Sequence, residues 1–269
     1  MEEIKSIMPH RRTWAELQMA RSEAGFADTE KKAYKCEKCH DEGWIILKRE
    51  GLQPTTTPCE CYKRREFERS LKNSGIAADL LTRCTLEKFQ PIDENARRMK
   101  ETAIAFLADE RARGIGYFGR SGSGKTHICI GACIKLAESG KSVKYMQYNP
   151  TMRKLLANKY NAEGYESVME PFAGCQVLYI DDLFKNAADL RTGHLAADEK
   201  RIMFELLDTR YKNNAVTIIS TEMSLQDIRK EDEAIASRIY ELVGKYGCRC
   251  DGANRRFARA HEKEDESDD

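Results

Sequence analysis

The segment IGYFGRSGSGKT, residues 115–126, is the most informative stretch of this 269-residue chain. Its last eight residues match the pattern G-x-x-x-x-G-K-[S/T] at every fixed position, between an apolar strand-like run and a helical run. Glycines let the backbone wrap closely around phosphate groups, and the N-terminus of the following helix adds partial positive charge. The motif in this context disfavours the alternative, a glycine-rich turn without a ligand. The segment predicts a phosphate cradle formed by Gly119, Arg120, Ser121, Gly122, Ser123, Gly124, Lys125 and Thr126.

The run QVLYIDD, residues 176–182, supplies an acidic half for the same site. An apolar strand that ends in carboxylates is common by itself, but it is far more specific when it follows a phosphate cradle. Lys125 is expected to reach the β- and γ-phosphates, and Thr126 to offer its hydroxyl to magnesium. Asp181 is expected to hold magnesium directly or through water, and Asp182 to orient or deprotonate the attacking water. The two motifs together predict a site that binds ATP with Mg²⁺ and hydrolyses ATP.

Strand-like and helical patterns alternate from residue 115 onward. This alternation predicts an α/β fold in which a parallel sheet is covered by helices on both faces. A helix is expected over 93–112, before the first strand. The expected strands are 115–119, 142–148, 176–181, 215–220 and the edge strand 247–251. The expected helices are 125–139, 150–160, 164–170, 198–212 and 232–243.

Four cysteines near the N-terminus form two short pairs. Cys36 and Cys39 make a CxxC pair, and Cys59 and Cys61 make a CxC pair, with nineteen residues between the pairs. Four thiolates from two knuckles suit a tetrahedral structural zinc, which leaves no open position for catalysis. Free thiols are the alternative. We favour structural Zn²⁺, because it would help to hold together a small domain with little core of its own.

The remaining cysteines are interpreted without a metal. Four lie among apolar or small residues and are expected to be buried thiols, namely Cys84, Cys129, Cys133 and Cys175. Cys248 and Cys250 form a CxC without a neighbouring pair, and we expect them to be strand residues.

Charge and hydropathy bound the function classes. The formal net charge of +1 excludes a globally basic nucleic-acid binder, although it leaves room for a local basic face. The run Lys63–Arg65 could contact DNA phosphates, but a solvated helix face is the favoured interpretation. No apolar run approaches the roughly 18 residues of a membrane helix, and no secretory signal is recognisable. We therefore expect a cytoplasmic protein without a membrane partner.

The order of these motifs resembles that of the bacterial and phage DnaC/DnaI-type helicase loaders, which are AAA+ ATPases. The resemblance runs from about residue 34 to residue 257 and rests on the cysteine knuckles, a helix, the P-loop and the segments IDD, STE and SRIYE. It implies a helical, zinc-binding N-terminal domain before the AAA+ core. The expected parts are a helicase-binding domain over 1–75 with helices near 10–30 and 60–73, a linker over 76–92, the ATPase domain over 93–257 and an acidic disordered tail over 258–269.

The resemblance also implies roles for individual residues. Lys125 and Thr126 correspond to Walker A, and Asp181 and Asp182 correspond to Walker B. Glu222 stands where many AAA+ proteins have the sensor 1 asparagine, so Thr221 or Glu222 could position the water, or the response to the γ-phosphate could be altered. Arg238 corresponds to the arginine finger that acts on ATP held by a neighbouring subunit. Arg255 corresponds to the sensor 2 arginine.

Three hypotheses for the function remain open. The first is an ATP-dependent loader that binds a DnaB-type replicative helicase, contacts single-stranded DNA and self-associates through its AAA+ domains. The second is an IstB-type transposition helper ATPase, whose core is closely similar but against which the cysteine knuckles argue. The third is an ATP-gated DNA-binding switch with little hydrolysis. The long segment 185–200 could face single-stranded DNA or a neighbouring subunit.

Overall fold

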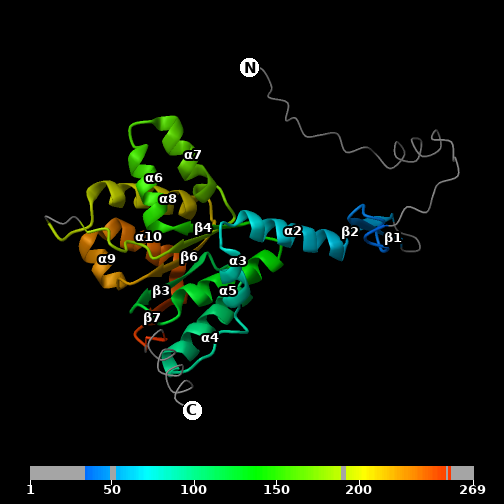
Figure 1. Cartoon of the computed structure of the whole chain (residues 1–269), viewed down its shortest axis with the longest axis horizontal. Helices are drawn as coiled ribbons and strands as arrows, with labels where there is room; N and C mark the ends of the chain where they lie inside the picture. Colours follow the sequence, from blue (N-terminus) through cyan, green and yellow to red (C-terminus); the bar gives the residue numbers. More distant parts are fainter. Residues whose placement is uncertain (1–33, 49–52, 189–191, 253, 256–269) are drawn as a thin grey trace, which may run out of the picture. The chain divides into compact units, whose positions relative to one another are not determined.

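The computed structural model describes residues 34–48, 53–188, 192–252 and 254–255 of the chain, which divides into two compact units, Met1–Cys59 and Glu60–Asp269 (Figure 1). The helix expected near residues 10–30 and the tail expected over 258–269 lie outside the described residues. Each unit is built around its own sheet.

The first unit contains a two-stranded antiparallel hairpin. Strand β1 (Trp44–Leu47) pairs with β2 (Thr55–Pro58), and Ile45 lies opposite Thr57. Pro58 ends β2, where a proline removes no central hydrogen bond of the ladder. The hairpin brings the chain segments before β1 and after β2 together.

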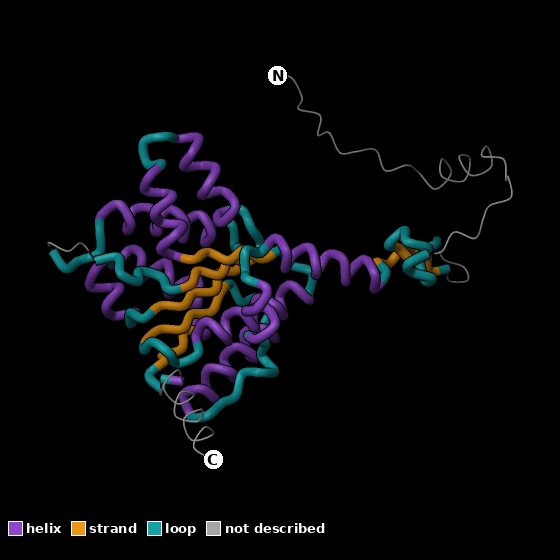
Figure 2. The backbone as a smooth tube through the Cα atoms, in the orientation of Figure 1, coloured by secondary structure: helices purple, strands orange, loops and turns teal. Residues whose placement is uncertain are grey.

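The second unit is built on a five-stranded parallel sheet with the order β4-β5-β6-β3-β7 (Figure 2). Its strands are β3 (Gly114–Gly119), β4 (Val143–Gln147), β5 (Val177–Asp181), β6 (Val216–Thr221) and β7 (Gly247–Cys250). Every residue of β5 is buried, as is typical of a central strand covered on both faces. The carboxyl ends of β3, β5 and β6 therefore meet at one edge of the sheet.

Helices cover both faces of this sheet, as the alternating pattern predicted. Side chains of β5 alternate between the two core layers, with Val177 and Tyr179 in one and Leu178 and Ile180 in the other. The first layer includes residues of α4 and α5, and the second includes residues of α6, α8 and α10. The helices are α2 (Glu60–Asn73), α3 (Ala78–Arg83), α4 (Glu94–Ala108), α5 (Lys125–Glu138), α6 (Tyr148–Ala157), α7 (Ala162–Ala173), α8 (Ala197–Lys212), α9 (Leu225–Glu231) and α10 (Glu233–Val243), with a 3-10 turn η1 (Gly244–Tyr246) before β7.

Several boundaries differ from those expected. The helix expected over 93–112 ends at Ala108, because the backbone N–H of Asp109 closes the last turn on the Phe106 carbonyl. Helix α9 was not expected. The division between the units falls after Cys59 rather than after residue 75, since α2 packs against α5 and β4. The range expected to be a linker, 76–92, contains α3 and contributes buried residues to the core of the ATPase unit.

A buried arginine connects three elements of the second unit. Arg210 of α8 is fully buried, and its guanidinium donates hydrogen bonds to one hydroxyl and four carbonyl oxygens. The acceptors are Thr217 Oγ1 at 2.9 Å and the carbonyls of Phe172 at 2.7 Å, Ala173 at 3.3 Å, Cys175 at 3.0 Å and Val216 at 2.6 Å. Arg210 thereby satisfies carbonyls at the end of α7 that lack helical partners and joins them to β6.

Candidate functional site

The predicted phosphate cradle forms the turn between β3 and α5. Gly122 and Gly124 have φ angles of +78° and +98°, in the left-handed region that favours glycine, and α5 begins directly after them. Lys125 is buried, and its ammonium donates to the Gly119 and Arg120 carbonyls at 2.7 Å each. Burial lowers the pKa of Lys125, while Cys250, Glu222 and Asp182 act in the opposite direction. The Lys125 ammonium thus lies inside the loop and donates to backbone carbonyls. A bound phosphate could take the place of these carbonyls as its acceptor.

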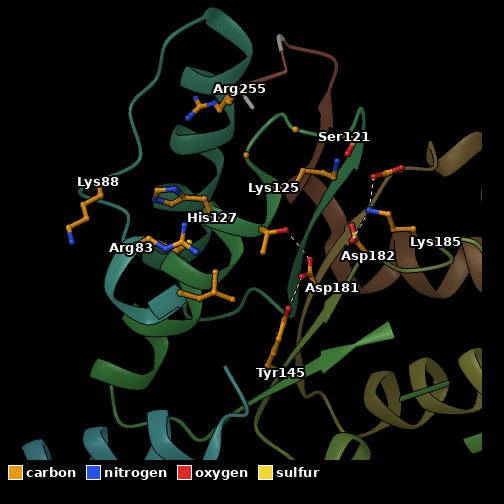
Figure 3. A pocket seen from close by; sticks show the side chains of 16 residues that line it. Arg83, Lys88, Ser121, Lys125, His127, Tyr145, Asp181, Asp182, Lys185 and Arg255 are labelled. Atoms are coloured by element: carbon orange, nitrogen blue, oxygen red, sulfur yellow. Dashed lines mark hydrogen bonds and ion pairs between the residues drawn. The ribbon is translucent and has the colours of Figure 1, made fainter. Parts of the chain in front are cut away.

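Asp181 ends β5 at the centre of a network of neutral donors (Figure 3). Its Oδ1 accepts hydrogen bonds from Thr126 at 3.1 Å, Tyr179 at 2.5 Å and Ser220 at 2.6 Å. Its Oδ2 accepts from the hydroxyl of Tyr145 at 2.8 Å. Burial and the charge of Asp181 raise the pKa of Tyr145, so this phenol remains a donor. The Thr126 hydroxyl and the Asp181 carboxylate are hard oxygen ligands of the kind Mg²⁺ prefers, and together they could hold this ion.

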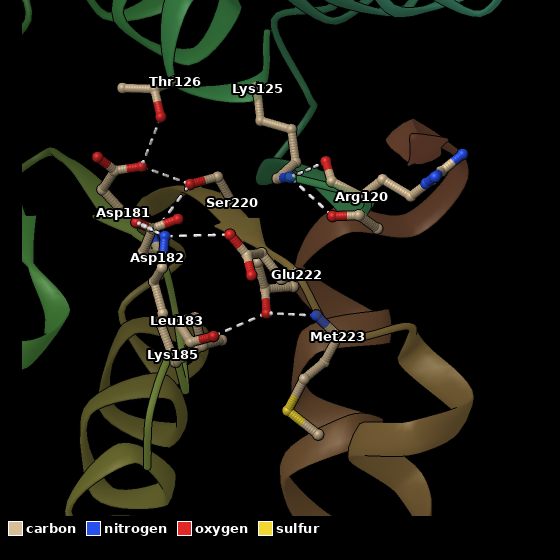
Figure 4. Close-up of polar contacts among 12 residues, drawn as sticks. Arg120, Lys125, Thr126, Asp181, Asp182, Leu183, Lys185, Ser220, Glu222 and Met223 are labelled. Carbon is tan, nitrogen blue, oxygen red and sulfur yellow. Dashed lines mark hydrogen bonds and ion pairs between the residues drawn. The ribbon is translucent and has the colours of Figure 1, made fainter. Parts of the chain in front are cut away.

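Asp182, Lys185 and Glu222 form a chain of ion pairs beside the cradle (Figure 4). The ammonium of Lys185 lies 2.9 Å from Asp182 Oδ2 and 3.0 Å from Glu222 Oε1. Burial tends to raise the pKa of Glu222, but hydrogen bonds from Lys185 and Ser121 and the charges of Lys185 and Lys125 lower it below its usual value. Glu222 is therefore ionised at neutral pH, and it faces the phosphate cradle.

A cavity of about 750 Å³ contains most of the predicted site residues. Its lining includes Ser121, Gly122, Gly124, Lys125, Thr126, Asp181, Asp182, Glu222 and Arg255, which the sequence predicted. It also includes Arg83, Lys88, His127, Tyr145 and Lys185, which the sequence analysis missed. The sequence placed Tyr145 in a strand but did not show that this strand, β4, lies beside β5. Without that pairing, the Tyr145 hydroxyl could not be assigned as a donor to Asp181.

The segment after β7 packs on the phosphate cradle. The backbone N–H of Arg255 donates to the Gly122 carbonyl at 2.9 Å, and the Arg255 guanidinium lies 4.3 Å from the centre of the Phe89 ring. The guanidinium also donates to the Gln90 carbonyl at 2.6 Å. A Cβ atom on Gly122 would lie 2.0 Å from Asn254 Oδ1, so the two segments are in close contact. Arg255 thus lines the cavity, and its sensor 2 role stays a prediction.

Arg238 is absent from the lining of this cavity. It lies on α10, where its guanidinium contacts Asp208 at 2.8 Å and Glu241 at 2.5 Å and stacks 4.6 Å from the centre of the Tyr211 ring. Hydrogen bonds to Glu241 and Asp208 raise the pKa of Arg238 above its usual value. A role on ATP would therefore have to be exerted on the nucleotide of another subunit.

The four N-terminal cysteines gather into one cluster. The sulfur atoms of Cys36, Cys39, Cys59 and Cys61 all lie within 4.8 Å of one another, and those of Cys36 and Cys59 are 3.8 Å apart. Tetrahedral coordination with Zn–S bonds of about 2.3 Å places sulfurs about 3.8 Å apart. The backbone N–H of Gly43 donates to Cys39 Sγ at 3.3 Å, as backbone amides do to metal-bound thiolates. The donor set fits a structural zinc ion, and all four cysteines are free of disulfides.

Comparison with known proteins identifies the family of the chain. The sequence model for the IstB-like ATP binding protein family matches residues 60–243, which is more than half of the chain. The chain belongs to this family. The phage-like element PBSX protein XkdC of Bacillus subtilis (strain 168) is 27% identical over 230 residues, which cover 82% of this chain and 84% of XkdC. The IstB-like chain is therefore an ATP-binding protein with a P-loop ATPase core.

Two solved structures have the same fold. The crystal structure of DnaI superimposes with a TM-score of 0.53 at 20% identity and covers 68% of this chain and 95% of its own. The crystal structure of the DnaC helicase loader superimposes with a TM-score of 0.52 at 21% identity, over 64% of this chain and 99% of its own. These likenesses confirm the AAA+ fold expected from the sequence. Among the described residues, no helix is long and apolar enough to cross a membrane.

Proposed function

We propose that this IstB-like chain is an ATP-dependent loader that binds a DnaB-type replicative helicase and delivers it to single-stranded DNA. The observation that carries the proposal is the four-cysteine cluster in a chain whose second unit has the fold of DnaI and the DnaC helicase loader. In the proposal the N-terminal part of the chain, where Cys36, Cys39, Cys59 and Cys61 would hold Zn²⁺, binds the helicase. The ATPase unit binds ATP, self-associates and contacts the DNA strand.

The cavity residues account for ATP hydrolysis as follows. Lys125 turns from the Gly119 and Arg120 carbonyls to the phosphates. Thr126 and Asp181 would hold Mg²⁺, which would neutralise charge on the phosphate oxygens. Asp182 orients a water molecule and takes its proton as the water oxygen bonds to the γ-phosphorus and the bond to ADP breaks. Positive charge on the transferred group comes from Arg238 of an adjacent subunit.

Co-purification with the helicase tests the partner. The full chain should retain a DnaB-type helicase, and a Cys36→Ser/Cys39→Ser variant should lose zinc and the helicase while it still binds ATP. A Cys84→Ser variant is the matched control, because it removes a buried thiol outside the cluster. A zinc-loaded chain that does not retain the helicase would refute the helicase-loader proposal and leave the ATP site unaffected.

A second candidate function is that of a transposition helper ATPase. The family match itself favours it, because residues 60–243 match the model of IstB-like proteins. Stimulation of a transposase by this chain, without retention of the helicase, would establish this candidate in place of the first.

The third possibility, an ATP-gated DNA-binding switch, is motivated by Glu222 at the sensor 1 position. Single-turnover hydrolysis separates it from the loader. An ATPase should lose turnover in Asp182→Asn, whereas a switch would show no turnover even with DNA and helicase present.

A further inference from the structure

We propose that Lys185 contacts the γ-phosphate of bound ATP, and that Glu222 is the internal anion that holds Lys185 while no triphosphate is bound. The inference rests on the proposed ATP site and adds a residue that distinguishes ATP from ADP by contact with the γ-phosphate. It does not depend on which partner the ATPase serves.

The turn after β5 is shaped to bring Lys185 back over the site. Asp182 and Phe184 have φ angles of +57° and +61°, which are uncommon for side chains larger than glycine. Backbone strain of this kind persists where the surrounding structure imposes it, and it concentrates at functional sites. The backbone N–H of Lys185 donates to the Asp182 carbonyl at 3.0 Å, so the turn is closed. The Lys185 ammonium consequently lies beside the carboxylate predicted to handle the attacking water.

The turn after β6 is fixed to the turn after β5. Thr221 donates its hydroxyl to the Leu183 carbonyl at 2.7 Å and accepts from the N–H of Met223 at 3.1 Å. The N–H of Leu183 donates to the Ser220 carbonyl at 2.9 Å, and Thr221 is fully buried. These bonds hold Glu222, which lies between Thr221 and Met223, opposite Lys185. The 3.0 Å ion pair is therefore built into two connected turns and is not a chance contact of long surface side chains.

Glu222 is surrounded by groups that bind anions. The Lys185 ammonium lies 3.0 Å from its carboxylate, and Lys185, Ser121 and Lys125 all lower the pKa of Glu222. All four residues line the same cavity. The groups around this carboxylate would also donate hydrogen bonds to a phosphate oxygen in the same place. Glu222 thus competes with a triphosphate for Lys185 and for the cradle.

The charges determine which anion Lys185 prefers. An ionised Glu222 cannot approach a γ-phosphate without like-charge repulsion, so it cannot make the contact that a neutral asparagine makes at this position. Lys185 can, because a charge-assisted bond from an ammonium to a phosphate oxygen is among the strong hydrogen bonds. When Lys185 turns to the γ-phosphate, it leaves both Glu222 and Asp182, and the Asp182 carboxylate becomes available to water. ADP lacks the γ-phosphate and leaves the ion pairs in place.

Nucleotide binding by the full chain tests the proposal without helicase or hydrolysis. Dissociation constants are measured with Mg²⁺ for ADP and for the β,γ-methylene analogue of ATP. Lys185→Met should weaken binding of the ATP analogue about tenfold, or about 1.4 kcal/mol, and leave ADP binding unchanged. Glu222→Gln should change binding in the opposite direction, so that the analogue binds more tightly and ADP nearly as before.

Lys230→Met is the matched control. Lys230 forms the same (i, i−3) ion pair with Asp227, at 3.1 Å, on α9 and outside the cavity lining. Its removal should leave the ratio of the two dissociation constants unchanged. An unchanged ratio in Lys185→Met, or equal weakening of both nucleotides, would overturn the proposal. Weaker binding of the analogue to Glu222→Gln would overturn the role of Glu222 as competitor. Failure to bind a helicase would leave all of these outcomes unaffected.

Discussion

Replacement of Arg210 by methionine should destabilise the ATPase unit by about 3–5 kcal/mol, because it leaves several buried oxygen atoms without their hydrogen-bond donor. The structure explains the size of this loss. Arg210 has no exposed surface, and its guanidinium is the donor for five oxygen atoms of α7, β6 and Cys175, which lies between α7 and β5. A buried acceptor left without its partner costs about 1–3 kcal/mol, and methionine supplies no donor. Its similar length keeps the cavity contribution small.

Urea titration followed by far-ultraviolet circular dichroism measures this loss. Tryptophan fluorescence is unsuitable, because the two tryptophans, Trp14 and Trp44, both lie in the unit Met1–Cys59. For a unit of this size, the melting temperature should fall by at least about 6 °C. Arg210→Lys should still lose more than about a third of the stability that Arg210→Met loses, because one ammonium cannot reach acceptors on both sides as the planar guanidinium does.

Arg201→Met is the control on the same helix. Its side chain is 69% exposed and pairs with Asp198 at 3.6 Å, so its removal should change stability by less than about 0.5 kcal/mol. Equal stabilities of Arg210→Met and Arg201→Met would refute the reasoning. It would mean that the freed carbonyls reach water or other donors after a small rearrangement.

Three further predictions concern the other charged and metal-binding groups. Arg238→Ala should lower ATP turnover at least about tenfold; mixing with Lys125→Ala subunits, whose own site is inactive, should restore part of it, and turnover that stays low in every mixture would argue against action on a neighbouring subunit. The chain should purify with about one zinc ion, which Cys59→Ser removes and Cys133→Ser retains, as metal analysis by mass spectrometry would show; equal zinc in both variants would place the metal elsewhere. Burial raises the pKa of Glu199 in spite of its hydrogen bond from Tyr148. The folded state therefore binds this proton more tightly than the unfolded state, so ionisation costs stability as the pH rises. Glu199→Gln should be more stable than the parent at pH 7, and this difference should shrink as the pH falls through the raised pKa toward 4.5. A gap that is constant with pH would show that the carboxyl group is not the cause.

Local patterns were sufficient to predict the sheet and the phosphate cradle. The cradle has fixed spacing, and β3, β5 and β6 are apolar runs at the lengths typical of buried strands, so short windows of sequence contain the information. The resemblance stated from the motifs is confirmed at the level of the family and the fold. The helicase, the DNA strand and the individual site residues stay predictions.

Features that depend on contacts between distant segments could not be predicted. Tyr145 and Lys185 come to the site because β4 lies beside β5 and because two turns are connected, and neither fact is visible in a single window. Arg210 reads as an ordinary charge near the end of a helix, although it is fully buried. Residues 76–92 were expected to be a linker because the alternation of strands and helices begins after them, yet Leu86 and Phe89 are buried in the core.

The contact between Asn254, Arg255 and the phosphate cradle has a practical consequence for work with shorter versions of this chain. A version that stops at Cys250 would retain every strand of the sheet, so it would fold by the usual criteria of helicity and solubility. It would nevertheless lack the segment that packs on Gly122 and Phe89, and its nucleotide affinity would describe a loop with one side exposed to solvent. Protease cleavage sites, affinity tags and fusion junctions should therefore be placed after Arg255.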